Sequence, residues 1–181
     1  VEFANQMHAH GLKTIAYNFS TGTPELDMWR YYADGAAASD YLGLHEYDAP
    51  RMDTLHQKSI AEGKGGMWLA LRYRRARAAL PPNARKPIII TECGVDGGVA
   101  NEYKQDGEGH RVKKLGYKDF RPEHPTSDYM AQLSWYDDEL NKDGYLVGAC
   151  LFCFGQDNAR WETFDLANDD EARPALVKVM T

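Results

Sequence analysis

One glutamate stands where enzymes with parallel sheets place a catalytic carboxylate. Residues 88–92 read Ile-Ile-Ile-Thr-Glu, and the turn-forming stretch 94–98 (GVDGG) follows. A β-branched run entered through Pro87 predicts a strand buried on both faces, as in parallel sheets. Such enzymes carry their active sites at the C-terminal ends of the strands. Glu92 is therefore the leading candidate for a catalytic residue.

A histidine and a tyrosine end the preceding predicted strand, residues 41–47 (YLGLHEY). Side chains alternate along a strand, so His45 and Tyr47 share one face, and Gly43 leaves room below them. A phenol that donates to a carboxylate keeps it ionised and fixes its rotamer, as a nucleophile requires. His45, Tyr47 and Glu92 are thus expected to converge on one pocket from adjacent strands.

The same alternation assigns the other side chains of these two strands. It places Ile88 and Ile90 on the face of Glu92, as apolar filling beneath the acid, and turns Cys93 toward the helices. Glu46 is also expected to face the helix layer and to pair with a cation there. We therefore do not expect Glu46 to act as a second catalytic acid.

Apolar periodicity, turn residues and caps predict four strand–helix units along the chain. The expected strands are 13–20, 41–47, the run ending in Glu92, and 145–154; the expected helices are 1–10, 24–38, 67–80, 128–141 (capped by Thr126 or Ser127) and 169–180. Long loops are expected over 48–66 and 95–125, the second with solvated acids such as Asp96. Strand–helix alternation with right-handed crossovers predicts an α/β fold with a parallel sheet.

Four strand–helix units are half of the eight in a (β/α)8 TIM barrel, which needs about 250 residues. The chain opens on a predicted helix with no strand before it and has no initiator Met, which suggests that upstream sequence is missing. We therefore expect residues 1–181 to form a single partial barrel domain, the C-terminal half with strands five to eight. The alternative is a complete four-stranded sheet, an unusually small size for a parallel one.

Composition argues against several classes of partner and cofactor. A net charge of −6 disfavours a nucleic-acid partner. No apolar run reaches the roughly 18 residues of a membrane span. Cys150 and Cys153 are three apart on a predicted strand and so point to opposite faces; with Cys93 they are expected to be buried free thiols, not metal ligands. No glycine-rich nucleotide motif follows a strand, so we expect neither a metal nor another cofactor.

The order and spacing of these segments resemble the second half of the clan A glycoside hydrolases, cellulase-like (β/α)8 barrels. Residues 44–47 (LHEY) resemble their sixth strand, and residues 89–94 (IITECG) resemble their seventh-strand nucleophile motif. Residues 149–155 and the following WETFD are similar to the eighth strand and its aromatic loop. Residues 18–22 (NFSTG) fit the fifth strand more loosely.

The resemblance implies a retaining hydrolase of O-glycosidic bonds in an oligo- or polysaccharide. Glu92 would be the nucleophile, and His45, Tyr47, Trp161 and Asn18 would bind substrate. The acid/base of the clan is a Glu after an Asn at the end of strand four. This chain has no Asn-Glu-Pro and no predicted strand four, so the residue is expected in the missing N-terminal half. The fragment alone should hydrolyse glycosides poorly, because general acid catalysis contributes roughly 10²–10⁴-fold.

Two other functions stay open. The barrel could bind glycan without cleaving it, with Trp161 as a sugar platform; the same ring could instead pack against the closing helix. A third possibility is an enzyme that uses Glu92 as a general base or a metal ligand, although no metal-type cluster is apparent on these strands. The sequence fixes neither the sugar, nor the linkage, nor the localisation.

Overall fold

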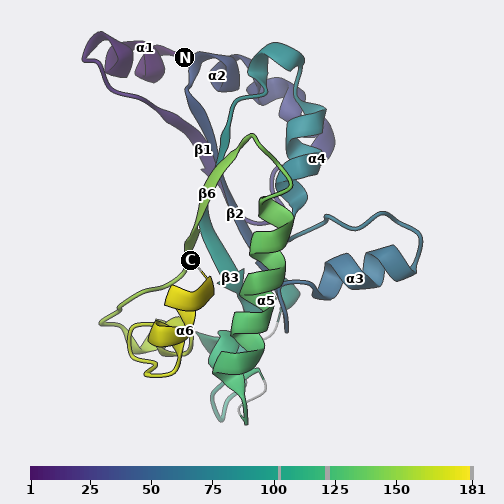
Figure 1. The fold of residues 1–181 in the computed structure, drawn as a ribbon, viewed down its shortest axis with the longest axis vertical. Helices are drawn as coiled ribbons and strands as arrows, with labels where there is room; N and C mark the ends of the chain where they lie inside the picture. The colour runs from purple at the N-terminus through teal and green to yellow at the C-terminus, as the bar shows by residue number, and fades with distance from the viewer. Residues whose placement is uncertain (102, 121–122, 180–181) are drawn as a thin grey trace.

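A four-stranded parallel sheet runs through the middle of the molecule (Figure 1). The computed structural model describes residues 1–101, 103–120 and 123–179. Along the sheet the order is β1 (Ile15–Phe19), β2 (Tyr41–Asp48), β3 (Ile88–Val95) and β6 (Leu146–Leu151). The predicted α/β class and parallel sheet are confirmed. The sheet is open, and the described residues form no closed barrel.

Helices and short 3₁₀ segments connect the strands. The α-helices are α1 (Glu2–Ala9), α2 (Ala33–Ala38), α3 (Thr54–Ala61), α4 (Arg72–Ala79), α5 (Pro125–Leu140) and α6 (Ala172–Val179). The 3₁₀ helices are η1 (Leu26–Tyr32), η2 (Pro82–Ala84), η3 (Gly97–Ala100), η4 (Tyr117–Asp119) and η5 (Ala159–Phe164). None of the helices in the described ranges is long and apolar enough to cross a lipid bilayer.

The main core lies between the sheet and helices α4 and α5. Leu42 and Leu44 of β2 and Ile88 and Ile90 of β3 are all at most 5% exposed. They share one buried cluster with residues of the two helices, among them Tyr73. Burying apolar surface on one face of the sheet is what fixes the strand register.

A β-bulge in β3 overturns one part of the predicted alternation. Leu44 pairs with Ile90, but the next residue, His45, pairs with Glu92, so Thr91 is the extra residue of the bulge. Ile88 and Ile90 therefore face the helices and not, as predicted, the side of Glu92. An extra residue reverses the side on which all later side chains emerge. The predicted position of Glu92 beside His45 is nevertheless found.

Glu46 faces the helix layer as predicted, but its partners are not a cation. The carboxylate is 1% exposed. It accepts hydrogen bonds from the amides of Leu71 (2.8 Å) and Tyr73 (2.7 Å) and from the Tyr136 hydroxyl (2.6 Å). Leu71 is the left-handed residue (φ 63°) before α4, so Glu46 binds the amides at the start of this helix. An anion is favoured at that position because the first amides of a helix lack intrahelical partners.

Several predicted helix boundaries are wrong for local reasons. The helix expected over 67–80 begins only at Arg72, because Met67 and Leu71 both adopt left-handed φ values of 60° and 63°. The helix expected over 24–38 is divided into η1 and α2. Helix α5 starts at Pro125 and not after Thr126 or Ser127, since proline is well suited to the first helical position.

The two predicted loops contain regular structure. Residues 48–66 include α3, and the buried carboxylate of Asp48 accepts from the amide of Leu55 (2.6 Å) in its first turn. Residues 95–125 include a hairpin of β4 (Tyr103–Gln105) and β5 (Arg111–Lys114). The end of this segment is attached to η5, because the amide of Gly116 donates to Thr163 Oγ1 (3.1 Å).

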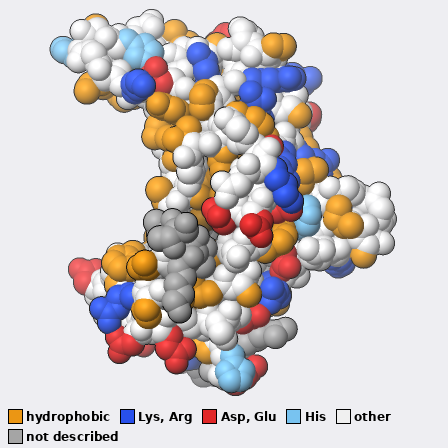
Figure 2. Space-filling view, viewed as in Figure 1, with side chains coloured by type: hydrophobic (Ala, Val, Ile, Leu, Met, Phe, Trp, Pro, Cys, Tyr) orange, Lys and Arg blue, Asp and Glu red, His pale blue; other side chains and the backbone are white. Residues whose placement is uncertain are grey.

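Strands β1 and β6 are the outer strands of the sheet. All six positions of β6 are at least partly exposed, and Val147 is 58% exposed. Figure 2 shows hydrophobic side chains uncovered beside α5 on this side of the molecule. Cys150 is exposed and Cys153 half-buried, so of the three free thiols only Cys93 is buried as predicted. Cys150 lies on this exposed outer strand and Cys153 in the loop that follows it, so neither position is enclosed by the core.

The open strand β6 leads to a prediction about self-association. We expect the isolated chain to dimerise or aggregate, because unpaired apolar edge strands pair with other chains. Val147→Lys should shift sedimentation velocity profiles toward monomer, whereas Ile60→Lys, at an exposed position of α3, should not. A monodisperse wild-type monomer at high concentration would contradict the prediction.

Candidate active site

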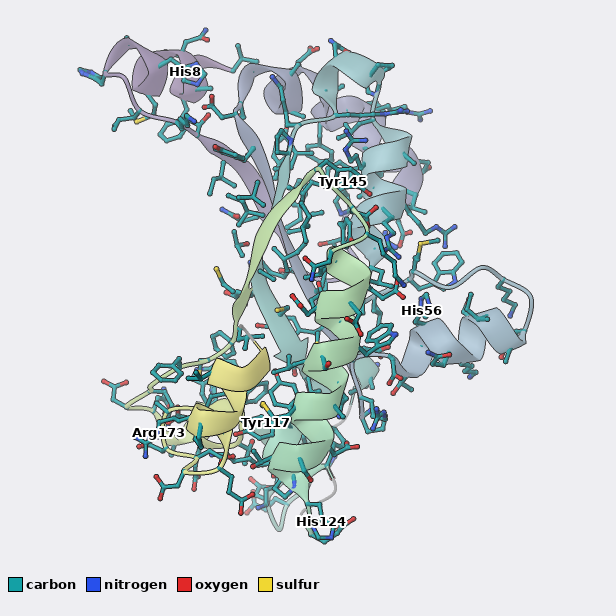
Figure 3. The ribbon with its side chains drawn as sticks, viewed as in Figure 1. His8, His56, Tyr117, His124, Tyr145 and Arg173 are labelled. Carbon is teal, nitrogen blue, oxygen red and sulfur yellow. The ribbon has the colours of Figure 1, made fainter. Side chains whose placement is uncertain are left out.

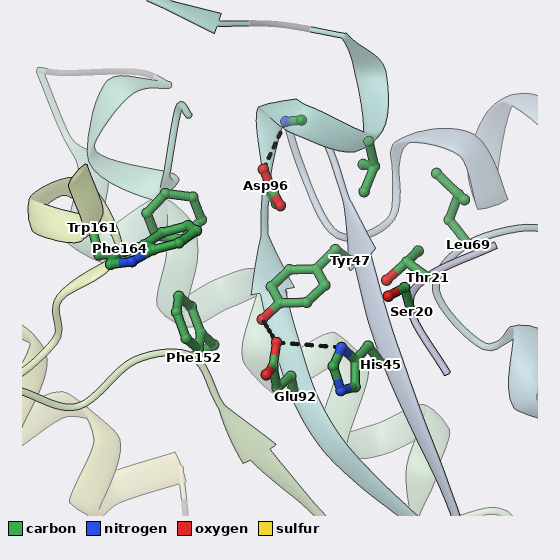
Figure 4. Close-up of a pocket in the computed structure, with 12 residues that line it drawn as sticks. Ser20, Thr21, His45, Tyr47, Leu69, Glu92, Asp96, Phe152, Trp161 and Phe164 are labelled. Carbon is green, nitrogen blue, oxygen red and sulfur yellow. Dashed lines mark hydrogen bonds and ion pairs between the residues drawn. The ribbon is translucent and has the colours of Figure 1, made fainter. Parts of the chain in front are cut away.

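Glu92, Tyr47 and His45 meet at the C-terminal ends of β2 and β3 (Figure 4). The Tyr47 hydroxyl donates to Glu92 Oε2 over 2.9 Å, and His45 Nδ1 lies 3.4 Å from the same oxygen. The Glu92 side chain is 38% exposed, so it remains accessible while one oxygen is held. The structure thus brings together the three residues that the alternation of β2 and the end of β3 predicted.

Tyr47 is suited to be a permanent hydrogen-bond donor. It is 6% exposed, and this burial, together with the negative charge of Glu92, raises the pKa of Tyr47 far above its usual value. The phenol therefore stays protonated whenever the carboxylate is ionised. A donor held in this way fixes Glu92 Oε2 and leaves the second oxygen available to a ligand.

The last part of β3 requires glycine at position 94. Gly94 has a φ of 156°, and a Cβ on it would lie 3.0 Å from the Tyr129 hydroxyl and 3.3 Å from the carbonyl oxygen of Phe152. The end of β6 thus packs directly against the end of β3, where the amide of Phe152 donates to the carbonyl of Cys93 (2.9 Å). This contact positions the β6 loop beside Glu92.

Glu92 opens into a cavity of about 490 Å³ at this end of the sheet. A volume of this size is typical of small-ligand sites. The lining residues are Ser20, Thr21, His45, Tyr47, Leu69, Glu92, Asp96, Gly98, Val99, Phe152, Trp161 and Phe164. Two of them carry carboxylates and none is a lysine or arginine, so this lining favours an uncharged ligand over an anionic one.

Three aromatic rings form one wall of the cavity. Trp161 meets Phe152 and Phe164 edge to face, with centroids 5.3 and 5.4 Å apart, and Phe152 meets Phe164 at 5.8 Å. Figure 4 shows this wall on one side of Glu92, with Ser20, Thr21 and Leu69 on the other. Edge-to-face packing holds the rings in fixed orientations. The cavity therefore has a rigid aromatic side and a side with hydroxyl groups.

Of the predicted ligand-binding residues, Asn18 is the one that does not line the cavity. Its side chain lies against Gly43 of β2, where an added Cβ would be 1.8 Å from Asn18 Oδ1. Gly43 precedes His45 by two residues, so Asn18 lies below the cavity on the same face. The room predicted beneath His45 exists, and Asn18 fills it.

The sequence interpretation missed several lining residues. The sequence predicts a solvated Asp96, but the residue is 6% exposed, and its Oδ1 accepts from the amide of Gly98 (2.7 Å) at the start of η3. Phe152 lies just beyond the end of β6, so the rule that strand ends carry the site could have identified it. Ser20 directly follows β1, so the same rule could have identified it as well. Leu69 carries no such signal, because it lies in the loop before α4.

A pair of tyrosine variants tests the hydrogen bond to Glu92. Tyr47→Phe should lower the free energy of unfolding by about 1 kcal/mol at pH 7, because a hydrogen bond to a partly exposed carboxylate is lost. Tyr129→Phe is the matched control: this hydroxyl is buried and has no hydrogen-bond partner in the described structure. Removing it should cost nothing or stabilise slightly. If urea unfolding showed that Tyr47→Phe and Tyr129→Phe lower the free energy of unfolding equally, the assigned hydrogen bond from Tyr47 would be contradicted.

Among the described residues, no group of three or more His, Cys, Asp or Glu side chains is arranged to hold a metal ion. The chemistry that the cavity itself offers is that of one oriented carboxylate, a phenol, an imidazole and an aromatic wall. Comparisons with known proteins found no matching protein-family model, no matching curated protein and no matching solved structure.

Proposed function

We propose that this chain provides the catalytic carboxylate of a retaining glycoside hydrolase, with Glu92 as the nucleophile. The observation that carries the proposal is the position of Glu92: it lies near the C-terminal end of a parallel strand, one oxygen is bound by Tyr47, and the side chain opens into the cavity. A wall of aromatic rings suits the C–H faces of a sugar, and the hydroxyl groups opposite suit its polar edge.

The proposed reaction proceeds in two displacements. First, a carboxylate oxygen of Glu92 bonds to the anomeric carbon while the bond from that carbon to the leaving oxygen breaks. Water then attacks the same carbon, the ester bond to Glu92 breaks, and the carboxylate is restored. Tyr47 keeps Glu92 in one rotamer during both steps. The leaving oxygen must gain a proton, and the attacking water must lose one.

These proton transfers require a second carboxylic acid about 5–5.5 Å from the nucleophile. The described carboxylates that line the cavity are Glu92 and Asp96, and Asp96 Oδ1 is already bound to the amide of Gly98. We infer that the acid/base is supplied by polypeptide that would complete a barrel around this sheet. The 181-residue chain by itself should then cleave ordinary glycosides poorly.

The same composition of the lining also favours a second candidate, a protein that binds carbohydrate without cleaving it. The aromatic wall would still hold a sugar ring if no acid/base were ever brought to Glu92. The two candidates differ in one respect: only the hydrolase forms a covalent bond between Glu92 and a sugar.

A trapping experiment separates them on the chain as it is. A 2,4-dinitrophenolate leaving group departs without protonation, so the missing acid is not needed for the first step. Neutral 2-deoxy-2-fluoro glycosides with this leaving group should add one sugar per chain, located at Glu92 by peptide mass spectrometry. Saturable binding of neutral oligosaccharides without an adduct would favour the second candidate. If the chain showed no saturable binding and formed no adduct, both candidates would be wrong.

A further inference from the structure

The segment that carries the cavity residue Leu69 is held by side chains of α3. Leu69 lines the cavity and follows a glycine-rich segment between α3 and α4. Gly63, Gly65 and Gly66 have φ values of 70°, 80° and 66°, and Met67 has 60°. We refer to residues 63–69 as the strap. Glycine adopts positive φ values readily, whereas methionine does so rarely, so contacts that hold Met67 help to decide where Leu69 lies.

Two side chains of α3 hold the strap by accepting hydrogen bonds. Ser59 Oγ accepts from the amide of Gly66 (3.1 Å) and from Trp68 Nε1 (2.9 Å). His56 Nδ1 accepts from the amide of Met67 (3.2 Å). The imidazole is packed so closely that a Cβ on Gly66 would lie 2.6 Å from Nδ1. Figure 3 shows His56 at the base of α3, on the side toward α5.

We propose that His56 is a positioning residue for the cavity: its unprotonated ring restrains the strap next to Leu69, and its protonation removes this restraint. A neutral imidazole can accept at Nδ1 only when its proton is on Nε2. A protonated imidazole is a donor at both nitrogens, so the Met67 amide would then face another N–H group. The bond would be replaced by a repulsive contact, and the strap would lose that restraint.

The surroundings of His56 set the pH at which this restraint is lost. Partial burial lowers the pKa of His56, as does the positive charge of Arg74 on α4, while Asp53 before α3 and Glu139 on α5 act in the opposite direction. The ring of Trp135 on α5 lies 5.7 Å from the imidazole. The restraint is therefore expected to be lost below about pH 6.5, which is the ordinary pKa of a histidine side chain. The strap stays held at neutral pH.

Other contacts of the segment differ from that of His56 in how they respond to pH. The Ser59 hydroxyl carries no charge that changes with pH, and the Trp68 ring that it binds also lies under the guanidinium of Arg75 (3.8 Å). Glu46 anchors the far end through the amide of Leu71 and has a pKa of about 7. A test must therefore separate His56 from Glu46.

Two replacements of His56 make that separation. Asparagine places an acceptor oxygen close to the position of Nδ1 and does not titrate, whereas leucine has no acceptor. Amide exchange corrected for intrinsic rates should show that protection of the Met67 amide in the wild type falls about tenfold from pH 7 to pH 5, the effect of losing one such bond. The Leu69 methyl resonances should move with the same midpoint. In His56→Asn the Met67 amide should stay protected at both pH values. In His56→Leu the same amide should be unprotected at both.

Two results would overturn the proposal. One is wild-type Met67 protection that does not change with pH after correction. The other is His56→Asn losing protection in acid with the wild-type midpoint, which would assign the effect to Glu46, Asp53 or Glu139. If His56→Leu fails to fold, His56→Asn decides alone. His10→Asn, at an exposed position after α1, is the control and should match the wild type. No ligand is used, so the outcome is independent of the proposed function.

Discussion

Replacing Glu92 by glutamine is expected to abolish the burst of dinitrophenolate that the wild-type chain should release from a neutral 2,4-dinitrophenyl glycoside. The burst corresponds to one glycosyl transfer to each chain, because the second step lacks a base to activate water. Glutamine keeps the size of the side chain and removes the charge that attacks the anomeric carbon. We expect the burst rate to fall by at least about 10³-fold, which is roughly 4 kcal/mol in the barrier.

Controls distinguish loss of the nucleophile from loss of structure. Glu62→Gln removes an exposed carboxylate that pairs with Lys64 and should keep the full burst. Glu92→Gly with added azide should regain release, because azide can bond to the anomeric carbon as dinitrophenolate leaves. A Glu92→Gln variant that keeps the wild-type burst would show that another group is the nucleophile.

Replacing Glu46 by glutamine should cause the second large effect, on stability and its dependence on pH. The amide group must direct an N–H at one of the three donors that now bind the carboxylate. A buried donor left without an acceptor costs about 1–3 kcal/mol. Urea unfolding at pH 8 should show a loss of this size.

The loss should grow as the pH is lowered. Burial raises the pKa of Glu46 to about 7, against the effect of its three hydrogen bonds. The folded state therefore binds a proton that the unfolded state releases between about pH 4.5 and 7. This contribution is complete at low pH and disappears as the pH rises through 7, a difference of roughly 3 kcal/mol at most. Glutamine cannot bind that proton, so the variant should be most destabilised at and below about pH 4.5.

Tyr136→Phe is the matched control for Glu46. It removes one of the three donors and keeps the titrating group, so it should cost about 1 kcal/mol and retain most of the pH dependence. Burial also raises the pKa of Asp48 to about 7. The free energy of unfolding of the Glu46→Gln variant should therefore still depend on pH, although less steeply than that of the wild type. If the free energy of unfolding of Glu46→Gln depended on pH as steeply as that of the wild type, the role assigned to Glu46 would be contradicted.

The features predicted correctly from sequence are those that depend on neighbours along the chain. The pairing of β2 skips none of its residues, so regular alternation correctly predicted the shared side of His45 and Tyr47 and the opposite direction of Glu46. The position of Glu92 followed from the apolar run that precedes it and the glycine turn that follows. Both predictions use only the two-residue period of a strand and the type of residue near its C-terminal end.

The features that were missed depend on contacts between distant segments. The bulge at Thr91 has no signal in an apolar run that reads the same on both faces. Glu46 finds backbone amides because Leu71 is left-handed, which only the packed segment before α4 determines. Asp96 is buried where its side chain accepts from the amide of Gly98 and its own amide donates to the carbonyl of Asp48, and no local sequence pattern predicts this loop conformation.

The single extra residue in β3 separates two tasks along one strand. Ile88 and Ile90, before it, contribute to the helix-side core, whereas Glu92, after it, belongs to the cavity. Trimming Ile90 should therefore weaken the fold without reshaping the cavity. Deleting Thr91 should instead rotate the carboxylate into the hydrophobic layer, so the number of residues in this strand matters to the chemistry as much as their identity.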